Sequence, residues 1–357
     1  MPTRLGRYWL PRKPLHDSSC LPDGRERVYW QVRKPSASEG VARQQTTLAV
    51  ADIGVVYLCR FAEGEGPVCR FLQSYENHPA GIDHDLHVLF KGFPGPSSLA
   101  SMRALFGDLP INPILLADVD YDIGSYIAAA GSISNRRVIF LNTFSQILTK
   151  DWLRYFDLAL NHSAVGVVGA TGSWQANASR DERAIKTILH NVAHLPSYIH
   201  QTTLPKKRTG GAMDEQRRKR PLGRYLFFPF YYLLNLYEFG RYPNPHIRTN
   251  AFMIERERFL SLRRPSFACK RGVFKFESGR LSMTRQILKH GLRPVIVDCG
   301  GNVYDVPEWR SSSTFHAGGQ KNLIIGDRRT HEYSVASPEF RRFLESQAWA
   351  NPWLWVP

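Results

Sequence analysis

Cysteine is scarce in this 357-residue sequence, and the five cysteines are scattered through it, with no C-x-x-C pair among them. An odd and dispersed set argues against a disulfide framework and against a structural zinc site, and it fits a reducing compartment. We therefore expect a cytoplasmic protein.

Long hydrophobic runs are also missing. The longest, YLFFPFYYLLNLY at 225–237, is interrupted by Pro229 and Asn235. A helix that spans a bilayer needs about 20 consecutive apolar residues, so this run is too short. The basic N-terminus lacks the apolar segment of a signal peptide. The sequence thus predicts a protein that is soluble or lies on a membrane surface.

Several well-known catalytic motifs are absent. The sequence has no G-x-x-x-x-G-K-[ST], no G-x-G-x-x-G after a strand, no G-x-S-x-G and no H-E-x-x-H. The hydrolase and dehydrogenase interpretations therefore lack their usual support. The segment VVGATGS at 167–173 ends a predicted strand in small residues and is a weak candidate for a phosphate-binding loop.

Acidic residues are few relative to basic ones. There are 47 Lys and Arg against 31 Asp and Glu, a formal net charge of +16. This excess favours anionic partners: nucleic acid, acidic lipid or phosphate-bearing small molecules. Nucleic acid is the least favoured of these, because the basic residues concentrate in two segments and no RNA-binding or zinc module is visible.

Strand-like and helix-like segments alternate from Thr47 onward. Such alternation predicts an α/β fold with a mostly parallel sheet and helices on both faces. The predicted strands are 54–60, 85–93, 113–120, 137–143, 164–173, 249–256 and 293–298, and the predicted helices are 69–78, 98–107, 123–133, 150–162 and 337–350.

The composition divides the chain into four parts. We expect a basic N-terminal arm (1–46), one main domain (47–305) with a basic and aromatic insertion (174–245), and a C-terminal extension (306–357). Within the insertion, basic residues precede the aromatic run, which suits an anionic membrane surface. A charged insertion followed by a core helix is the alternative. The basic residues are Lys206, Lys207, Arg208, Arg217, Arg218, Lys219, Arg220 and Arg224.

Small polar residues follow the predicted strand RVIFLNTFSQ (137–146). Asn142, Thr143 and Ser145 take the place of a Gly/Pro loop at its end. In open α/β sheets, ligands bind beyond the carboxyl ends of the strands, so these side chains are candidate ligand contacts. Alternatively, they only terminate the strand.

Three alternate aspartates stand in ADVDYDIGS. Asp122 is a plausible helix N-cap, and Gly124 lets the backbone turn closely. Together with Asp118 and Asp120, it forms a carboxylate set that can also hold a divalent cation with a diphosphate, or bind a sugar hydroxyl.

Glu277 stands in FKFESGRLSMTRQILKHG, between an expected strand end and a helix beginning near Ser278. Capping explains a carboxylate at a helix N-terminus, and a general base that takes the proton of an attacking hydroxyl is the alternative. Arg280 and Arg285 are near enough to pair with it or with a phosphate.

Three polar residues alternate in PNPHIRTNAFMIER. His246, Arg248 and Asn250 share one face if the segment is extended. An imidazole, a guanidinium and an amide on one face suit a phosphate or a hydroxyl-rich ligand.

The order of these segments resembles that of family 2-like glycosyltransferases, which have the GT-A fold. The resemblance covers about residues 50–300 and implies transfer of a sugar from a nucleotide sugar to a hydroxyl of a glycan or lipid-linked acceptor in cell-surface polysaccharide synthesis. Glu277 matches the catalytic-base position and Ser278 a second acidic position. The implied acceptor or phosphate contacts are His246, Arg248, Asn250 and Arg280, and the implied donor contacts are Tyr57, Arg60, Lys91, Asp120, Asp122, Gly124, Asn142, Thr143 and Ser145.

The sequence departs from the family at one point. The acidic pair that binds a metal–diphosphate in the family is replaced here by Thr143 and Ser145. Either Asp120 or Asp122 (or Asp118) substitutes as ligand for Mg²⁺ or Mn²⁺, or Lys91 and Arg248 neutralise the diphosphate. The departure also leaves open a non-catalytic protein of the same fold that binds a sugar nucleotide or glycan. The basic and aromatic insertion adds the expectation of a peripheral position at the inner face of the cell membrane.

Overall fold

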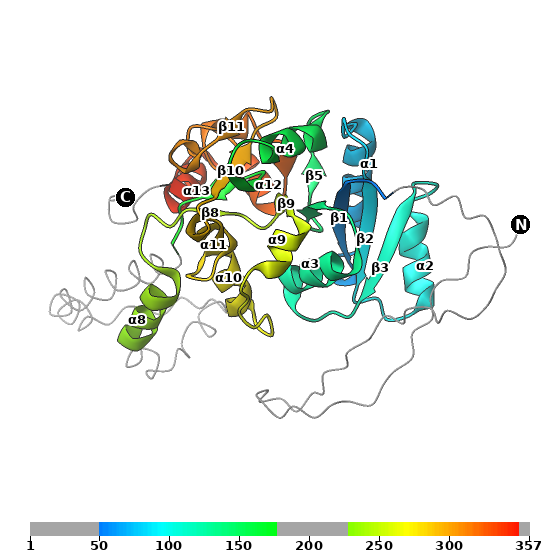
Figure 1. Ribbon diagram of the computed structural model, residues 1–357, viewed down its shortest axis with the longest axis horizontal. Helices are drawn as coiled ribbons and strands as arrows, with labels where there is room; N and C mark the ends of the chain where they lie inside the picture. Colours follow the sequence, from blue (N-terminus) through cyan, green and yellow to red (C-terminus); the bar gives the residue numbers. More distant parts are fainter. Residues whose placement is uncertain (1–49, 177–227, 350–357) are drawn as a thin grey trace, which may run out of the picture. The chain divides into compact units, whose positions relative to one another are not determined.

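The computed structural model describes residues 50–176 and 228–349 (Figure 1). Their main feature is an eight-stranded sheet in the order β11-β10-β6-β9-β4-β1-β2-β3. β9 runs antiparallel to both its neighbours, β11 runs antiparallel to β10, and the remaining pairs are parallel. The strands are β1 (Ile53–Arg60), β2 (Asp85–Lys91), β3 (Ile111–Leu116), β4 (Arg137–Leu141), β6 (Val165–Gly169), β9 (Ala251–Glu255), β10 (Arg293–Val297) and β11 (Val303–Tyr304).

Helices cover both faces of this sheet. The side chains of β1 alternate, so that Val55 and Tyr57 join one core and Val56 and Leu58 the other. The first core includes residues of α1 (Glu65–Asn77), α2 (Pro96–Ala104) and α4 (Trp152–Leu160). The second includes residues of α3 (Tyr121–Ser132), α9 (Arg256–Ser261), α10 (Lys270–Ser278) and α11 (Met283–Lys289). The predicted α/β class, with a mostly parallel sheet between two helical layers, is confirmed.

Two predicted strands end earlier than expected. β3 stops at Leu116, so Asp118 and Asp120 follow the strand instead of belonging to it. The segment 164–173 divides into β6 and the short β7 (Gly172–Ser173), which pairs with β8 (His246–Ile247) in a separate small sheet. Both differences move polar residues off the strands and onto the carboxyl edge of the sheet.

The C-terminal extension packs into the same cores. Trp309 is fully buried, and its ring leaves no room for a side chain at Gly172, where a Cβ would lie 2.4 Å from it. β12 (Ile325–Gly326) pairs with β5 (Gln146–Ile147). The remaining described helices are α8 (Phe228–Phe239), α12 (Arg328–Ser334), α13 (Pro338–Trp349) and the 3₁₀ turns η1 (Phe61–Glu63), η2 (Val306–Glu308) and η3 (Gly318–Gln320).

The N-terminal arm, most of the insertion with its basic cluster, and the last eight residues lie outside the described ranges. Within residues 50–176 and 228–349, no helix is both long enough and apolar enough to cross a bilayer.

Candidate functional site

The carboxyl ends of the parallel strands bring several predicted residues to one edge of the sheet. β1 ends at Arg60, β2 at Lys91, and β4 just before Asn142. Because β9 runs the other way, Asn250 at its start lies at the same edge. The backbone N–H of Asn142 donates to the carbonyl of Asn250 over 3.0 Å.

Arg60 and Asp118 form a bidentate pair at this edge. The guanidinium Nε and Nη2 donate to the two carboxylate oxygens over 2.9 and 2.8 Å, and Nη1 reaches Glu63 over 3.2 Å. The hydrogen bond from Arg60 is the main reason that the pKa of Asp118 lies below its ordinary value. Of the three aspartates, Asp118 is thus already committed to a cation of the protein.

Lys91 is almost completely buried beneath the first turn of α3. Its Nζ donates to the carbonyl of Tyr121 over 2.5 Å and to Ser125 Oγ over 2.9 Å. Burial lowers the pKa of Lys91, and the nearby charge of Asp122 opposes this effect. The ammonium therefore supports the junction between β3 and α3 from below.

That junction has an unusual backbone. Asp120 and Tyr121 adopt positive φ angles of 60° and 48°, a conformation that costs about 1–3 kcal/mol for a residue with a side chain. Gly124 is required here, because a Cβ at this position would lie 2.4 Å from the Cβ of Asp120. The prediction that Asp122 is the N-cap is wrong: Asp120 is the N-cap residue, and Asp122 lies in the first turn.

Asp122 is exposed to solvent, yet desolvation by the surrounding protein raises the pKa of its carboxyl. Lys91 and Arg60 oppose this shift, and Glu277 adds to it. Since α10 packs against α3, the two carboxylates of Asp122 and Glu277 lie near enough to repel one another.

The polar residues after β4 are held by local hydrogen bonds. Asn142 Oδ1 accepts from the Phe144 N–H over 3.0 Å and from Ser145 Oγ over 3.2 Å, which is an Asx turn. Thr143 and Ser145 are buried, and the Thr143 carbonyl accepts from the buried Tyr57 hydroxyl over 3.0 Å. These contacts are those of strand termination, and their predicted role in donor binding stays a prediction.

The alternating trio does not form one extended face. Only His246 lies in a strand, β8, and residues 248–250 form the turn that leads into β9. Asn250 turns inward and accepts from Thr171 Oγ1 over 3.0 Å. Asn250 Nδ2 is buried, with no hydrogen-bond partner within the described ranges.

Arg248 is neutralised within the protein. Its Nη2 donates to Asp327 over 2.8 Å, and its guanidinium lies 4.2 Å from the ring centre of Phe315. Burial pushes the pKa of Asp327 upward, but the charge of Arg248 and hydrogen bonds from Thr330 outweigh it and leave that pKa below its ordinary value.

Glu277 lies at the C-terminal end of α10, not at the start of a helix as predicted. The segment expected as a strand is helical because Val273 and Phe276 recur at helical spacing and pack into the second core. A carboxylate is disfavoured by the helix dipole there. Its Oε1 accepts instead from the backbone N–H and the hydroxyl of Thr249, each over 3.3 Å.

Glu277, His246 and Arg248 line one cavity of about 630 Å³. Asn142 does not border it, and neither does Arg280, which lies over Tyr237 of α8 at 4.7 Å. The other lining residues come from α10, from the chain next to β7 and, above all, from the C-terminal extension. They are Ser173, Gln175, Phe274, Ser278, Phe315, His316, Arg329, Glu332, Phe340, Phe343, Leu344, Gln347 and Ala348.

His246 is a neutral imidazole at pH 7. Burial lowers the pKa of His246. The positive charges of Arg248 and Arg285 lower it further, and the negative charge of Glu277 raises it in part. Its Nδ1 lies 2.9 Å from the carbonyl of Asn244, which can only accept, so Nδ1 carries the proton. Nε2 is therefore the nitrogen with the free lone pair, which can accept a hydrogen bond from a hydroxyl.

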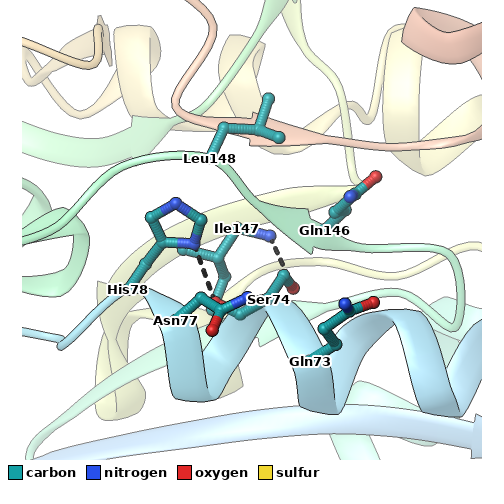
Figure 2. Close-up of a pocket in the computed structure, with 7 residues that line it drawn as sticks. All are labelled: Gln73, Ser74, Asn77, His78, Gln146, Ile147 and Leu148. Carbon is teal, nitrogen blue, oxygen red and sulfur yellow. Dashed lines mark hydrogen bonds between the residues drawn. The ribbon is translucent and has the colours of Figure 1, made fainter.

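A second, smaller cavity of about 300 Å³ lies between α1 and β5 (Figure 2). Its polar residues serve the fold: Ser74 Oγ accepts from the Ile147 N–H over 3.0 Å, and His78 Nδ1 lies 2.9 Å from the Ser74 carbonyl. No predicted site residue lines it. Gln73, Asn77, Gln146 and Leu148 complete the lining.

The described residues contain no group of three or more His, Cys, Asp or Glu arranged to hold a metal ion. With Asp118 engaged by Arg60, the remaining candidates are Asp120 and Asp122. Mg²⁺ is commonly held by one or two carboxylates together with substrate phosphates. The role of these two carboxylates as metal ligands stays a prediction.

Sequence reasoning missed several residues of the cavity. Thr249, which fixes Glu277, and Phe315, His316 and Arg329, which form the far wall, belong to no motif. Asp327 opens α12 with a capping box, a feature that the spacing D-R-R-T suggests. Its pairing with Arg248 links positions far apart in the chain and gives no local signal.

No family model matches the chain, and no curated protein matches it. Solved structures do show similarity, all of it distant. A mannosyltransferase from Pyrobaculum calidifontis in complex with GDP-Man and Mn²⁺ shares 12% identity at a TM-score of 0.29, over 38% of this chain and 41% of that one. The chain thus covers less than half of that protein.

Two further structures are similar. A putative nucleotide-diphospho-sugar transferase from Desulfovibrio desulfuricans G20 shares 16% identity at a TM-score of 0.26, over 33% of this chain and 58% of that one. Mouse xyloside xylosyltransferase 1 shares 13% identity at a TM-score of 0.36, over 69% of this chain and 85% of that one. The similarity is to sugar-transferring enzymes, at the level of fold.

We predict that His316 makes the protein acid-sensitive. Burial, with a contribution from Arg248, lowers the pKa of His316 from 6.5 to about 4. Between pH 6.5 and 4, the unfolded chain binds a proton at His316 and the folded chain does not. The free energy of unfolding therefore falls by about 1.4 kcal/mol per pH unit as the pH drops through this range. His316→Gln should flatten this slope in urea unfolding between pH 7.5 and 5. His331→Gln, at an exposed position on α12, is the control, and equal slopes in both variants contradict the prediction.

Proposed function

We propose that this chain is a glycosyltransferase that moves a sugar from a nucleoside-diphosphate sugar to an acceptor hydroxyl, with Glu277 as general base. The observation that carries the proposal is the position of this carboxylate. It is fixed by Thr249, lines a cavity beside the neutral His246, and acts electrostatically on Asp122 at the carboxyl edge of the sheet.

The proposed donor site is the carboxyl edge of the sheet at the start of α3. Asp120 and Asp122 lie there above the buried ammonium of Lys91, and Arg60 stands beside them. A sugar hydroxyl or ribose suits the carboxylates. A divalent cation held by Asp120, Asp122 and the diphosphate would neutralise the leaving group.

The proposed reaction is a single displacement. Glu277 takes the proton of the acceptor hydroxyl while the oxygen attacks the anomeric carbon. The bond between that carbon and the phosphate oxygen breaks, and the nucleoside diphosphate leaves with the electron pair. Stabilisation of the departing charge is the dominant electrostatic requirement of such a step. His246 Nε2 suits a second hydrogen bond to a hydroxyl of the acceptor.

We propose a lipid-surface contact on α8. Leu233 and Tyr237, four residues apart on one side of the helix, are 63% and 66% exposed. Arg280 stacks on Tyr237, and Arg271 and Lys275 of α10, which packs against α8, pair with Glu238 of α8. Exposed apolar side chains beside cations suit an anionic membrane, and such a position suits a lipid-linked acceptor.

We predict that a nucleoside-diphosphate sugar stabilises the protein. A ligand at 100 times its Kd adds about 2.7 kcal/mol to the free energy of unfolding, which a thermal-shift assay detects. The panel should contain GDP-mannose and UDP-sugars, each with and without Mn²⁺ or Mg²⁺. Asp122→Asn should weaken the apparent affinity for the nucleoside-diphosphate sugar at least tenfold and so lower the thermal shift. Asp108→Asn, which changes an exposed carboxylate at the other edge of the sheet, is the control and should leave the affinity unchanged. A panel without any shift contradicts the proposal.

We predict that Glu277→Gln lowers turnover by about 10²–10⁴, the usual contribution of a general base, while donor affinity stays unchanged. Glu257→Gln, at a 78% exposed carboxylate on α9, is the control and should retain full activity. If Glu277→Gln retains full turnover, Glu277 is not the general base. Donor binding by a wild-type protein that never turns over favours the non-catalytic alternative.

We predict that the protein floats with liposomes that contain phosphatidylserine and does not float with neutral phosphatidylcholine liposomes. Leu233→Ser with Tyr237→Ser should reduce the bound fraction several-fold. The control is Leu288→Ser, a 46% exposed residue on α11. Unchanged flotation of the double variant argues against this surface.

A further inference from the structure

The cavity at Glu277 has two unlike walls. One consists of α10 and β8, which contribute Glu277 and His246. The other is built by the C-terminal extension, chiefly α12 and α13, with Phe315 before them. This second wall lies beyond the part of the chain that resembles glycosyltransferases, so its chemistry has to be interpreted from the residues themselves.

Aromatic rings form the apolar part of the lining. Phe274 and Phe340 stay 36% and 42% exposed, and Phe340 stacks against Phe343 with ring centres 5.8 Å apart. Exposure of large rings to water is energetically unfavourable, and free energy is gained when an apolar surface of a ligand packs against them. The C–H face of a sugar ring is such a surface, and it is flat enough to stack on a ring.

Polar side chains line the same cavity as these rings. Arg329 pairs with Glu332 over 2.9 Å at the rim, and Gln175 Nε2 donates to Gln347 Oε1 over 3.4 Å. Guanidinium, carboxylate and amide groups exchange hydrogen bonds with hydroxyls in both directions. An acyl chain cannot hydrogen-bond to these groups. It would bury them without partners, at a cost of about 1–3 kcal/mol each.

The floor of the cavity carries no unpaired cation among the described residues. Arg248 is held by Asp327, and His246 is a neutral imidazole that offers a lone pair. A phosphate therefore finds no free positive charge beside Glu277, and the carboxylate itself repels it. A neutral hydroxyl suits this floor.

The wall is rigid. The guanidinium of Arg248, the ring of Phe315 and the ring of His316 stack in succession, with separations of 4.2 and 3.8 Å, and Tyr333 follows at 5.1 Å. The cavity volume of about 630 Å³ lies within the 300–1,000 Å³ typical of pockets that hold drug-sized ligands. A disaccharide is a ligand of that size.

We propose that this cavity is the acceptor site and that it binds the neutral end of a glycan, one or two sugar rings long, with one hydroxyl at Glu277. The sugar faces stack on Phe340 and Phe274, and Arg329 and Glu332 bind hydroxyls at the rim. The role as acceptor site rests on the proposed function, whereas the binding of a neutral glycan rests on the cavity alone.

The experiment measures binding by saturation-transfer NMR with a panel of methyl hexosides and methyl disaccharides. n-Octanol and inorganic pyrophosphate serve as the apolar and anionic comparisons. Four proteins are compared: wild type, Phe340→Ala, Arg329→Ala and Arg342→Ala. The last is a matched control, because Arg342 is an exposed arginine of α13 that faces Glu339 three residues away, as Arg329 faces Glu332, and it does not line the cavity.

We expect at least one glycoside to bind to wild type and to Arg342→Ala with equal affinity, and at least tenfold more weakly to Phe340→Ala and Arg329→Ala. Equal melting temperatures show that the variants are folded. The proposal is overturned if no glycoside binds, if all four proteins bind equally, or if octanol or pyrophosphate displaces the glycosides.

The nucleotide-sugar panel on the same proteins separates the two proposals. Glycoside binding without any nucleotide-sugar binding overturns the transferase function and leaves a glycan-binding site. Nucleotide-sugar binding and turnover without glycoside binding overturn the present inference alone.

Discussion

The buried ion pair between Arg248 and Asp327 joins the two parts of the site. It connects the turn before β9 to the start of α12, and both side chains are largely withdrawn from solvent. Such pairs contribute little net stability, because desolvation offsets their attraction, but breaking one leaves an uncompensated charge. Its structural effect is therefore to fix the start of α12 against the turn before β9. The cavity, its aromatic wall and the environment of Glu277 all depend on that position.

The carboxyl edge and the cavity differ in their charged groups. At the edge, Arg60 is paired with Asp118, and Lys91 is buried beneath the first turn of α3 with Asp122 nearby. The cavity holds a carboxylate, a neutral imidazole and an arginine that is already paired. The carboxylates of Asp122 and Glu277, which influence one another electrostatically, connect the two regions.

Much of the fold was predictable because it rests on local patterns. Apolar runs such as that of β4 and the periodicity of α4 appear directly in the sequence, and their alternation gives the α/β class. Glu277 was predicted near the start of a helix and lies at the end of one, since the FKF segment fits a strand and a helix equally well. The partners that give the site its shape, Thr249 and Asp327, were not predictable. They act through contacts between segments distant in sequence, and no spacing rule encodes such contacts.

The helix end that carries Glu277 has an electrostatic consequence. The C-terminus of α10 carries the partial negative charge of its last backbone carbonyls, and Glu277 stands in this last turn. Together the two disfavour an anion at this end of the helix. An anion is therefore kept at a distance from this end of α10 by charge alone, whereas a neutral molecule approaches it without that penalty.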